Sequence, residues 1–263
     1  MFAKISSEKI VEISFMNKEN RKVALVTGCT GGLGTAICKK LYKDGYIVVG
    51  NHLTYSKGEA WLTAMREQGF QVPIYQCDIT DYDKVGEMVK LIEAEVGGID
   101  ILVNNAAITK DGQFRKMTYE RWDLVLKTNL YSVFNCTRHV INQMIERQYG
   151  RIINISSVNA QRGQFGQVNY AAAKAGIHGF TKTLAVEVAN KGITVNTISP
   201  GYIATDMVMA IAEDVRRKII ESIPVGRLGG TEEIAHLVSF LASEESSFIT
   251  GANYAINGGQ HMY

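Results

Sequence analysis

Short runs rich in β-branched residues alternate along this chain with longer segments of helical periodicity, and this alternation is what most restricts the possible fold. The first apolar run covers 22–27, and the segment 32–44 after it places Leu33, Ile37 and Leu41 at helical spacing. Parallel strands need a crossover connection, which is usually a helix. The repeated strand–helix order therefore predicts an α/β fold: one doubly wound domain with a parallel sheet and helices on both faces.

The same pattern predicts the individual elements. We expect strands at 22–27, 46–50, 72–77, 99–103, 151–156, 193–199 and 253–256, which makes a sheet of about seven strands. Helices are expected at 32–44, 56–68, 81–96, 118–147, 168–190, 206–222 and 231–242. Met16 resembles an alternative start, so residues 1–16 are predicted to be a flexible extension and 17–263 to form the single domain.

Charge and cysteine usage exclude several classes of protein. The 263 residues carry 28 basic and 26 acidic side chains, with no basic tract or acidic tail, so neither nucleic acid nor a membrane surface is an expected partner. No CxxC pair and no histidine partner at ligand spacing accompany the four cysteines, and we expect no metal. His139, His178 and His236 are interpreted as packing or surface residues. With no secretory signal and no apolar run long enough to span a membrane, a cytoplasmic protein is expected.

A glycine-rich turn follows the first predicted strand. The sequence there is Thr27-Gly28-Cys29-Thr30-Gly31-Gly32-Leu33-Gly34. Glycines let a backbone turn tightly and approach a pyrophosphate, which then rests on the positive N-terminus of the next helix. A glycine-rich run can equally serve a turn alone, but its position between a strand and a helix favours a dinucleotide site. We predict that Thr27, Gly28, Gly32, Leu33 and Gly34 bind a cofactor.

The spacing TGxxxGxG resembles the short-chain dehydrogenase/reductase family, and the resemblance extends from Val23 to the C-terminus. It implies a Rossmann-type domain that uses a nicotinamide cofactor. By this resemblance Asp78 and Ile79 lie at the adenine, Asn105 and Ala106 in Asn104-Asn105-Ala106-Ala107 lie beside the cofactor, and Pro200, Gly201, Ile203 and Thr205 hold the nicotinamide. Ala107 stands where the family has glycine.

Tyr170 and Lys174 lie four residues apart on a predicted helix and therefore share one face. A nearby ammonium favours the phenolate and is expected to lower the pKa of Tyr170 towards a useful range. Ser157 lies thirteen residues before Tyr170, at the end of the fifth strand, where its hydroxyl can donate to a substrate carbonyl. The family resemblance adds Asn129 as the fourth catalytic residue, which supports the lysine through water.

The stretch after the second strand, 50–57, contains no acid that would bind a ribose 2′-hydroxyl. Ser56 and Lys57 could instead donate to a 2′-phosphate, so we predict that the cofactor is NADPH. The alternative is that Ser56 is a helix N-cap and Lys57 an exposed lysine.

Within the family, the segments 114–118, 157–167 and 257–262 resemble bacterial acetoacetyl-CoA reductases. The resemblance implies reduction of a 3-oxoacyl thioester, acetoacetyl-CoA, to the (R)-3-hydroxyacyl-CoA used in polyhydroxybutyrate synthesis. The residues predicted to bind substrate are Gln164, Phe165, Gln167 and Tyr202 at the acyl chain, and Asp111 and Lys116 at the pantetheine or a CoA phosphate.

Two alternative functions remain open, and the resemblance also implies an oligomeric state. A 3-oxoacyl-acyl-carrier-protein reductase would share the fold, the cofactor and the chemistry, although Gln148 and Tyr149 are uncharged where an acidic carrier favours basic residues; Lys191 is basic. A non-enzymatic NADPH-sensing subunit would tend to lack Tyr170 or Lys174. The family resemblance also implies a homotetramer built through 118–147, 168–190 and 253–256.

Overall fold

The computed structural model describes residues 21–262, so the predicted extension 1–16 lies outside the described residues. Seven parallel strands form one sheet in the order β3-β2-β1-β4-β5-β6-β7. They are β1 (Val23–Val26), β2 (Ile47–His52), β3 (Ile74–Gln76), β4 (Ile99–Asn104), β5 (Gly150–Ile155), β6 (Ile193–Pro200) and β7 (Asn253–Ile256). This confirms the doubly wound α/β fold.

Helices connect the strands and cover both faces of the sheet. They are α1 (Gly32–Lys43), α2 (Tyr55–Glu67), α3 (Tyr82–Glu95), α4 (Tyr119–Leu126), α5 (Ser132–Arg147), α6 (Asn159–Arg162), α7 (Val168–Val188), α8 (Asp206–Met209), α9 (Glu213–Glu221) and α10 (Thr231–Ala242). Four shorter turns complete the set: η1 (Phe114–Lys116), the π-helical turn η2 (Lys127–Tyr131), η3 (Ala189–Lys191) and η4 (Glu244–Ser246).

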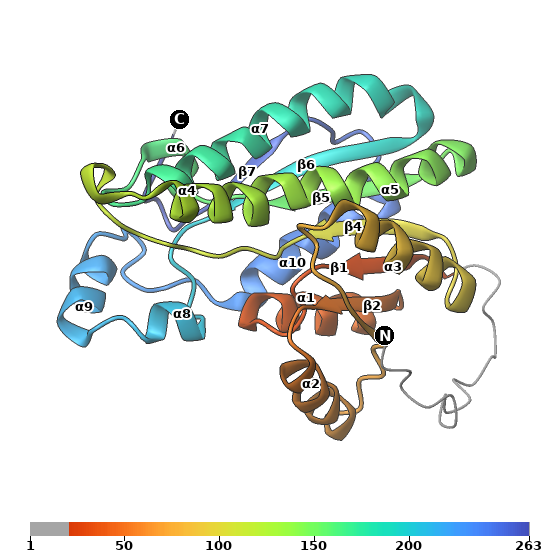
Figure 1. Cartoon of the computed structure of the whole chain (residues 1–263), viewed down its shortest axis with the longest axis horizontal. Coiled ribbons are helices and arrows are strands. Elements are labelled where there is room, and N and C mark those ends of the chain that lie inside the picture. The colour runs from red at the N-terminus through yellow and green to blue at the C-terminus, as the bar shows by residue number, and fades with distance from the viewer. Residues whose placement is uncertain (1–20, 263) are drawn as a thin grey trace.

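Two apolar layers enclose the sheet. On one face, side chains of α1, α2 and α10 pack against alternate residues of the central strands. On the other face, α3, α5 and α7 cover the remaining strand residues, and Figure 1 shows α5 and α7 running along the sheet. Strands β1, β4, β5 and β6 are buried along their whole length. That double burial explains why apolar residues stand next to one another in these strands instead of strictly alternating with exposed polar ones.

The strand order reverses beside β1, because β2 lies on one side of it and β4 on the other. In doubly wound sheets the ligand site lies outside the carboxyl ends of the strands at such a reversal. The loops that leave β1, β4, β5 and β6 carry most of the predicted site residues, and the parallel register brings these loops to the same edge.

The predicted and observed elements differ where long helices were expected. The predicted helix 118–147 is interrupted by the π-turn η2, and the predicted helix 206–222 consists of α8 and α9 separated by a short break. The four-residue helix α6 and the turn η1 were not predicted. By contrast, α10 and β7 have the predicted bounds.

Candidate active site

The turn between β1 and α1 leaves no room for larger residues at two of its glycines. Gly28 has φ +64°, and a Cβ there would lie 2.9 Å from the Cα of Ala106. A Cβ on Gly34 would lie 2.4 Å from the carbonyl oxygen of Gly28. The N-cap of α1 is Gly31, which has no side chain to bind the first-turn N–H groups, and that turn contains no acid. Backbone donors at a helix N-terminus fit a pyrophosphate.

Thr27 and Asn105 join the ends of β1 and β4. The Thr27 hydroxyl accepts from the backbone N–H groups of Asn105 and Ala106 at 3.0 and 3.1 Å, and Asn105 Nδ2 donates to the Thr27 carbonyl at 2.9 Å. Among the described non-glycine residues, Gln148 alone has a positive φ. Alanine at position 107 is therefore unstrained, although the family has glycine there.

The loop after β6 lies against this turn. A Cβ on Gly201 would come within 2.8 Å of the Cα of Asn257, which explains the glycine. Ile203 is buried and forms a parallel bridge with Gly229. A Cβ on Gly32 would meet Thr205 at 3.8 Å, so the predicted nicotinamide loop and the phosphate turn are in reach of one another.

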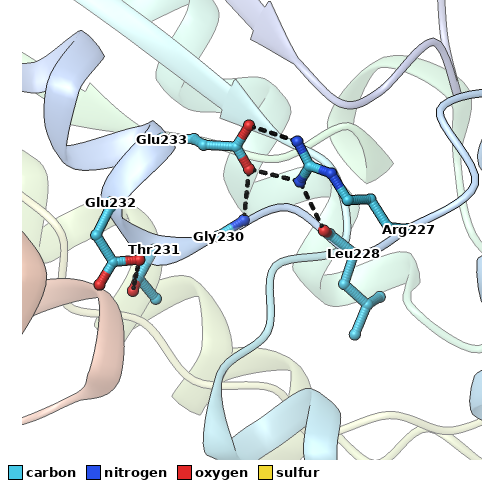
Figure 2. A network of polar contacts seen from close by, with 6 residues as sticks. All are labelled: Arg227, Leu228, Gly230, Thr231, Glu232 and Glu233. Atoms are coloured by element: carbon cyan, nitrogen blue, oxygen red, sulfur yellow. Dashed lines mark hydrogen bonds and ion pairs between the residues drawn. The ribbon is translucent and has the colours of Figure 1, made fainter.

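Figure 2 shows the contacts that support this loop from outside. The Arg227 guanidinium donates two hydrogen bonds to the Glu233 carboxylate, which also accepts from the Gly230 N–H at 2.7 Å. The hydrogen bonds from Arg227 and then from Gly230 lower the pKa of Glu233 to about 2. The intervening Gly229 exchanges backbone hydrogen bonds with Tyr202 and Ala204. Sequence reasoning did not identify this ion pair.

The region around the adenine and ribose sites fits a phosphate-bearing cofactor. Asp78 Oδ1 accepts from the backbone N–H and the hydroxyl of Thr80, so its turn is fixed, and Ile79 is buried beside it. Helix α2 begins at Tyr55 with Thr54 as N-cap, which makes no side-chain capping bond. Ser56 is thus not the N-cap, contrary to the alternative interpretation, and both Ser56 and Lys57 are exposed in a first turn that contains no acid.

Helix α7 presents Tyr170 and Lys174 to the end of β5. Lys174 is buried, and its Nζ donates to the Ile155 carbonyl at 2.6 Å and lies 5.9 Å from the centre of the Tyr170 ring. Ser157 follows β5, and its hydroxyl lies near enough to the Tyr170 phenol to lower the pKa of that phenol. The structure thus brings Ser157, Tyr170 and Lys174 together at one point of the sheet edge.

The pKa of Tyr170 is raised, which corrects the expected lowering. Burial is the main cause and the charge of Asp111 adds to it, while the hydrogen bond from Ser157 opposes both. Lys174 is not among the groups that lower the pKa of Tyr170, and burial lowers the pKa of Lys174 itself to about 7. The phenol therefore carries its proton at neutral pH, and its raised pKa makes it a weaker acid than a free tyrosine.

Asn129 lies in the π-turn η2 and is completely buried. Its Oδ1 accepts from the N–H of Ile108 and its Nδ2 donates to the carbonyl of the same residue, both at 2.9 Å. The side chain therefore clamps the loop that leaves β4. π-turns occur frequently at functional sites.

A polar chain behind Lys174 was also missed by sequence reasoning. The Ser156 hydroxyl donates to the Lys174 carbonyl, and His178 Nε2 lies 2.8 Å from Ser156 Oγ and 3.3 Å from Ser199 Oγ. Burial and then the charge of Lys182 lower the pKa of His178. His178 is thus half-buried in a network that joins α7 to β5 and β6.

Of the predicted substrate residues, Asp111 and Gln167 are in direct contact. Asp111 Oδ2 accepts from Gln167 Nε2 at 2.9 Å, while Lys116 in η1, Gln164 and Phe165 are exposed. Tyr202 is partly buried, and its N–H points to the Gln260 side chain. An open hollow of about 450 Å³ adjoins Asp111; its lining residues are Thr109, Lys110, Asp111, Glu120, Arg121 and Leu124.

Gln148 and Tyr149 lie at the other end of the sheet. They precede the first residue of β5, whereas Ser157 follows its last, and Gly192 packs against the Gln148 carbonyl at the start of β6. Within one subunit these residues are far from the catalytic side chains along the strand. Their lack of charge therefore says nothing about the entrance to the site of the same subunit. The expectation that these uncharged residues favour CoA over an acidic carrier protein is corrected accordingly.

Comparisons with known proteins cover nearly the whole chain. A family model described as enoyl-(acyl carrier protein) reductase matches residues 28–261. The chain is 54% identical over 243 residues, 92% of its length and 99% of the other, to an acetoacetyl-CoA reductase of Cupriavidus necator. It is 52% identical over 244 residues (92% and 99%) to an acetoacetyl-CoA reductase of Allochromatium vinosum, and 44% identical over 247 residues (94% and 100%) to a 3-oxoacyl-[acyl-carrier-protein] reductase of Escherichia coli. No helix in the described part of the chain is both long and apolar enough to cross a membrane.

Proposed function

Because this chain belongs to the short-chain dehydrogenase/reductase family and is a nicotinamide-dependent oxidoreductase, we propose that it reduces acetoacetyl-CoA with NADPH. The product is (R)-3-hydroxybutyryl-CoA, a precursor for polyhydroxybutyrate synthesis. The observation that carries the proposal is the convergence of Ser157, Tyr170 and buried Lys174 at the end of β5. Relatives named acetoacetyl-CoA reductases, 52–54% identical over nearly their full length, support the substrate.

The chain offers a complete set of groups for the cofactor. Gly28, Gly32, Leu33 and Gly34 present backbone N–H groups to the pyrophosphate, and Asn105 and Ala106 line the floor beside them. Pro200, Gly201, Ile203 and Thr205 hold the nicotinamide. Asp78 and Ile79 meet the adenine.

NADPH is favoured over NADH at the ribose. Helix α2 has no acid in its first turn, and its N-cap Thr54 makes no side-chain capping bond. Its free N-terminal donors, together with Ser56 and Lys57, suit a 2′-phosphate, since anions are stabilised at helix N-termini.

The reduced nicotinamide, when bound, supplies the hydride that adds to the carbonyl carbon. Ser157 donates a hydrogen bond to the carbonyl oxygen as negative charge develops there. Tyr170, which is protonated at neutral pH, transfers its phenolic proton to that oxygen. Lys174 holds the cofactor ribose and favours the phenolate that remains after proton transfer. Asn129 fixes the loop after β4.

The acyl thioester lies between the loops that carry Gln164, Phe165, Gln167 and Tyr202. Lys116, exposed on η1, contacts a CoA phosphate. Asp111 is unsuited to a phosphate because its carboxylate would repel the charge, and its hydrogen bond to Gln167 indicates a role in shaping the pocket.

We extend the proposal to assembly and location. Tyr131 and Phe134 on the outer side of η2 and α5 are exposed, whereas Val133, Cys136, Val140 and Met144 face the sheet. An exposed apolar face of this kind is expected to become buried between subunits of a homotetramer related by two-fold axes. The four cysteines are free and buried, as suits a cytoplasmic enzyme.

An assay of NADPH oxidation tests the function. Purified enzyme should oxidise NADPH with acetoacetyl-CoA at a higher kcat/KM than with acetoacetyl linked to an acyl carrier protein. The carrier-linked substrate is the second candidate because of the 44% identical Escherichia coli relative. A clear preference for it would replace acetoacetyl-CoA reduction with fatty-acid synthesis.

A further inference from the structure

The backbone that follows Ser157 fixes the direction of its hydroxyl. The N–H of Asn159 donates to Ser157 Oγ at 3.1 Å, and the hydrogen bond from Ser157 to the Tyr170 phenol lowers the pKa of that phenol. A hydroxyl carries one proton and two acceptor positions. Because the Asn159 N–H occupies an acceptor position, the Ser157 proton is left to point at Tyr170 or at a carbonyl oxygen.

The side chain of Asn159 is held in turn from the opposite wall of the pocket. Asn159 is 92% buried, with 8% of its surface exposed. Its Nδ2 donates to Gln167 Oε1 at 2.9 Å, and Gln167 Nε2 donates to Asp111 Oδ2 at 2.9 Å. The loops are also joined by a backbone hydrogen bond of 2.8 Å from the Gly112 N–H to the Gly166 carbonyl.

The Asp111 carboxylate determines which way the hydrogen bonds between Asn159, Gln167 and Asp111 run. Ionised Asp111 can only accept, so Gln167 must turn its Nε2 towards it and its Oε1 towards Asn159. With both amides reversed, Gln167 Oε1 would face the carboxylate with no proton between them. The observed direction leaves Asn159 Oδ1 buried and without a partner among the described residues, which is costly. The charge of Asp111 therefore outweighs that cost.

We propose that Asn159 is a positioning residue that aims the Ser157 hydroxyl, and that Asp111 and Gln167 hold it in that position. The proposal rests on the proposed function in taking Ser157 and Tyr170 as the reacting pair. It gives Asp111 a task that does not involve contact with CoA. The wall of the substrate pocket and the hydroxyl that steadies the carbonyl are thereby connected through three side chains.

Variants that reverse the direction of these hydrogen bonds test this connection. Asn159→Asp places a carboxylate opposite Gln167 Oε1, and we expect kcat to fall about tenfold, as for one misplaced hydrogen bond. In the double variant Asp111→Asn/Asn159→Asp, Gln167 turns over, donates to the new carboxylate and accepts from the new amide. All the hydrogen bonds between the three side chains are then present again in the opposite direction, and kcat should return to within about threefold of wild type. Gln71→Glu, the same amide-to-acid change at an exposed position between α2 and β3, is the matched control and should change nothing.

If the double variant is slower than Asn159→Asp alone, Asp111 acts on substrate directly and the proposal is overturned. An unchanged kcat in Asn159→Asp would overturn it as well.

A second readout needs no substrate and therefore does not depend on the proposed function. Asp111 from the loop after β4 and Ser157 from the loop after β5 act on the pKa of the Tyr170 phenol. Lys174 on α7 also faces the ring, with Nζ 5.9 Å from its centre. Asn159→Leu should raise the pKa of Tyr170, because Ser157 no longer donates to it reliably. Ultraviolet titration of tyrosinate, as the difference from Tyr170→Phe in the same background, measures the shift. A residue that only shapes the pocket would leave the titration unmoved, which would overturn the proposal even where kcat falls.

Discussion

The glycine-rich turn after β1 (27–34) and the cluster of Ser157, Tyr170 and Lys174 lie at the same edge of the sheet, yet one depends on the backbone and the other on side chains. The turn after β1 works through the backbone: its glycines leave space, and its N-cap Gly31 leaves N–H groups for an anion. The cluster after β5 works through side chains, among them Lys174, Asn129 and Ser157, all buried. An added side chain should therefore damage the first region, and the removal of one should damage the second.

The largest effect is expected where one atom is removed from the cluster. Tyr170→Phe deletes the proton donor, and kcat should fall by about 10²-fold or more. NADPH binding, measured by fluorescence titration, should be unchanged because the phosphate turn is untouched. Near-normal turnover by a folded Tyr170→Phe variant would remove this residue from the mechanism and weaken the contrast between the regions.

The reverse experiment adds one carbon to the turn. A Cβ at position 34 would lie 2.4 Å from a backbone oxygen, so Gly34→Ala should lower the free energy of unfolding by about 1–3 kcal/mol and weaken NADPH binding. Gly31→Ala is the control in the same turn, since its nearest atom would be 3.7 Å away, an ordinary contact. Equal losses in both variants, seen by thermal unfolding and NADPH titration, would show that the turn tolerates no side chain anywhere.

A smaller effect is expected at the ribose, where one side chain supplements the backbone. Lys57→Ala should weaken NADPH binding by about 1–3 kcal/mol, the range for a hydrogen bond to a charged group, and barely change NADH binding. Lys90→Ala, exposed on α3, should change neither. Binding titrations of the wild type and the variant with NADPH and with NADH test this prediction. Equal losses of affinity for both cofactors would mean that Lys57 only stabilises α2. Tighter binding of NADH than of NADPH by the wild type would contradict the assignment of NADPH.

The smallest effect is expected at the edge of the substrate pocket. Lys116→Glu should raise KM for acetoacetyl-CoA several-fold with little change in kcat, the pattern of lost uniform binding. Because Lys116 is exposed, the difference from wild type should shrink as salt screens the contact. Steady-state kinetics with a short ketoester that lacks CoA supply the control, and an equal loss for both substrates would assign Lys116 to the fold.

The sequence predicted the backbone region better than the side-chain region. The strand–turn–helix order with spaced glycines led directly to the turn after β1, and apolar periodicity led to the unchanged bounds of α10 and β7. These signals are local, because each depends on residues adjacent along the chain. The positions of Tyr170 and Lys174 were also predictable, since four residues of helix separate them.

What the sequence did not reveal depends on contacts between distant segments. Asn159, Gln167 and Asp111 meet only because two loops close on one another, and no spacing rule indicates that. The direction of the Tyr170 pKa was predicted wrongly because proximity of the ammonium was considered and burial of the pair was not. Gln148 was assigned to the entrance of the site, although it lies just before β5 and the site lies beyond the other end of that strand.

The π-turn at Lys127–Tyr131 also limits how this protein can evolve in length. An α-helix advances by about 100° per residue, whereas a π-turn winds more loosely because its hydrogen bonds run from residue i to i+5. The five residues of this turn therefore cover about the angle of four α-helical residues, so loss of one amino acid would restore regular winding without rotating α5. Such a deletion would spare the packing of α5 but would release Asn129 from Ile108, so it is the support of the loop after β4 that fixes the length of this stretch.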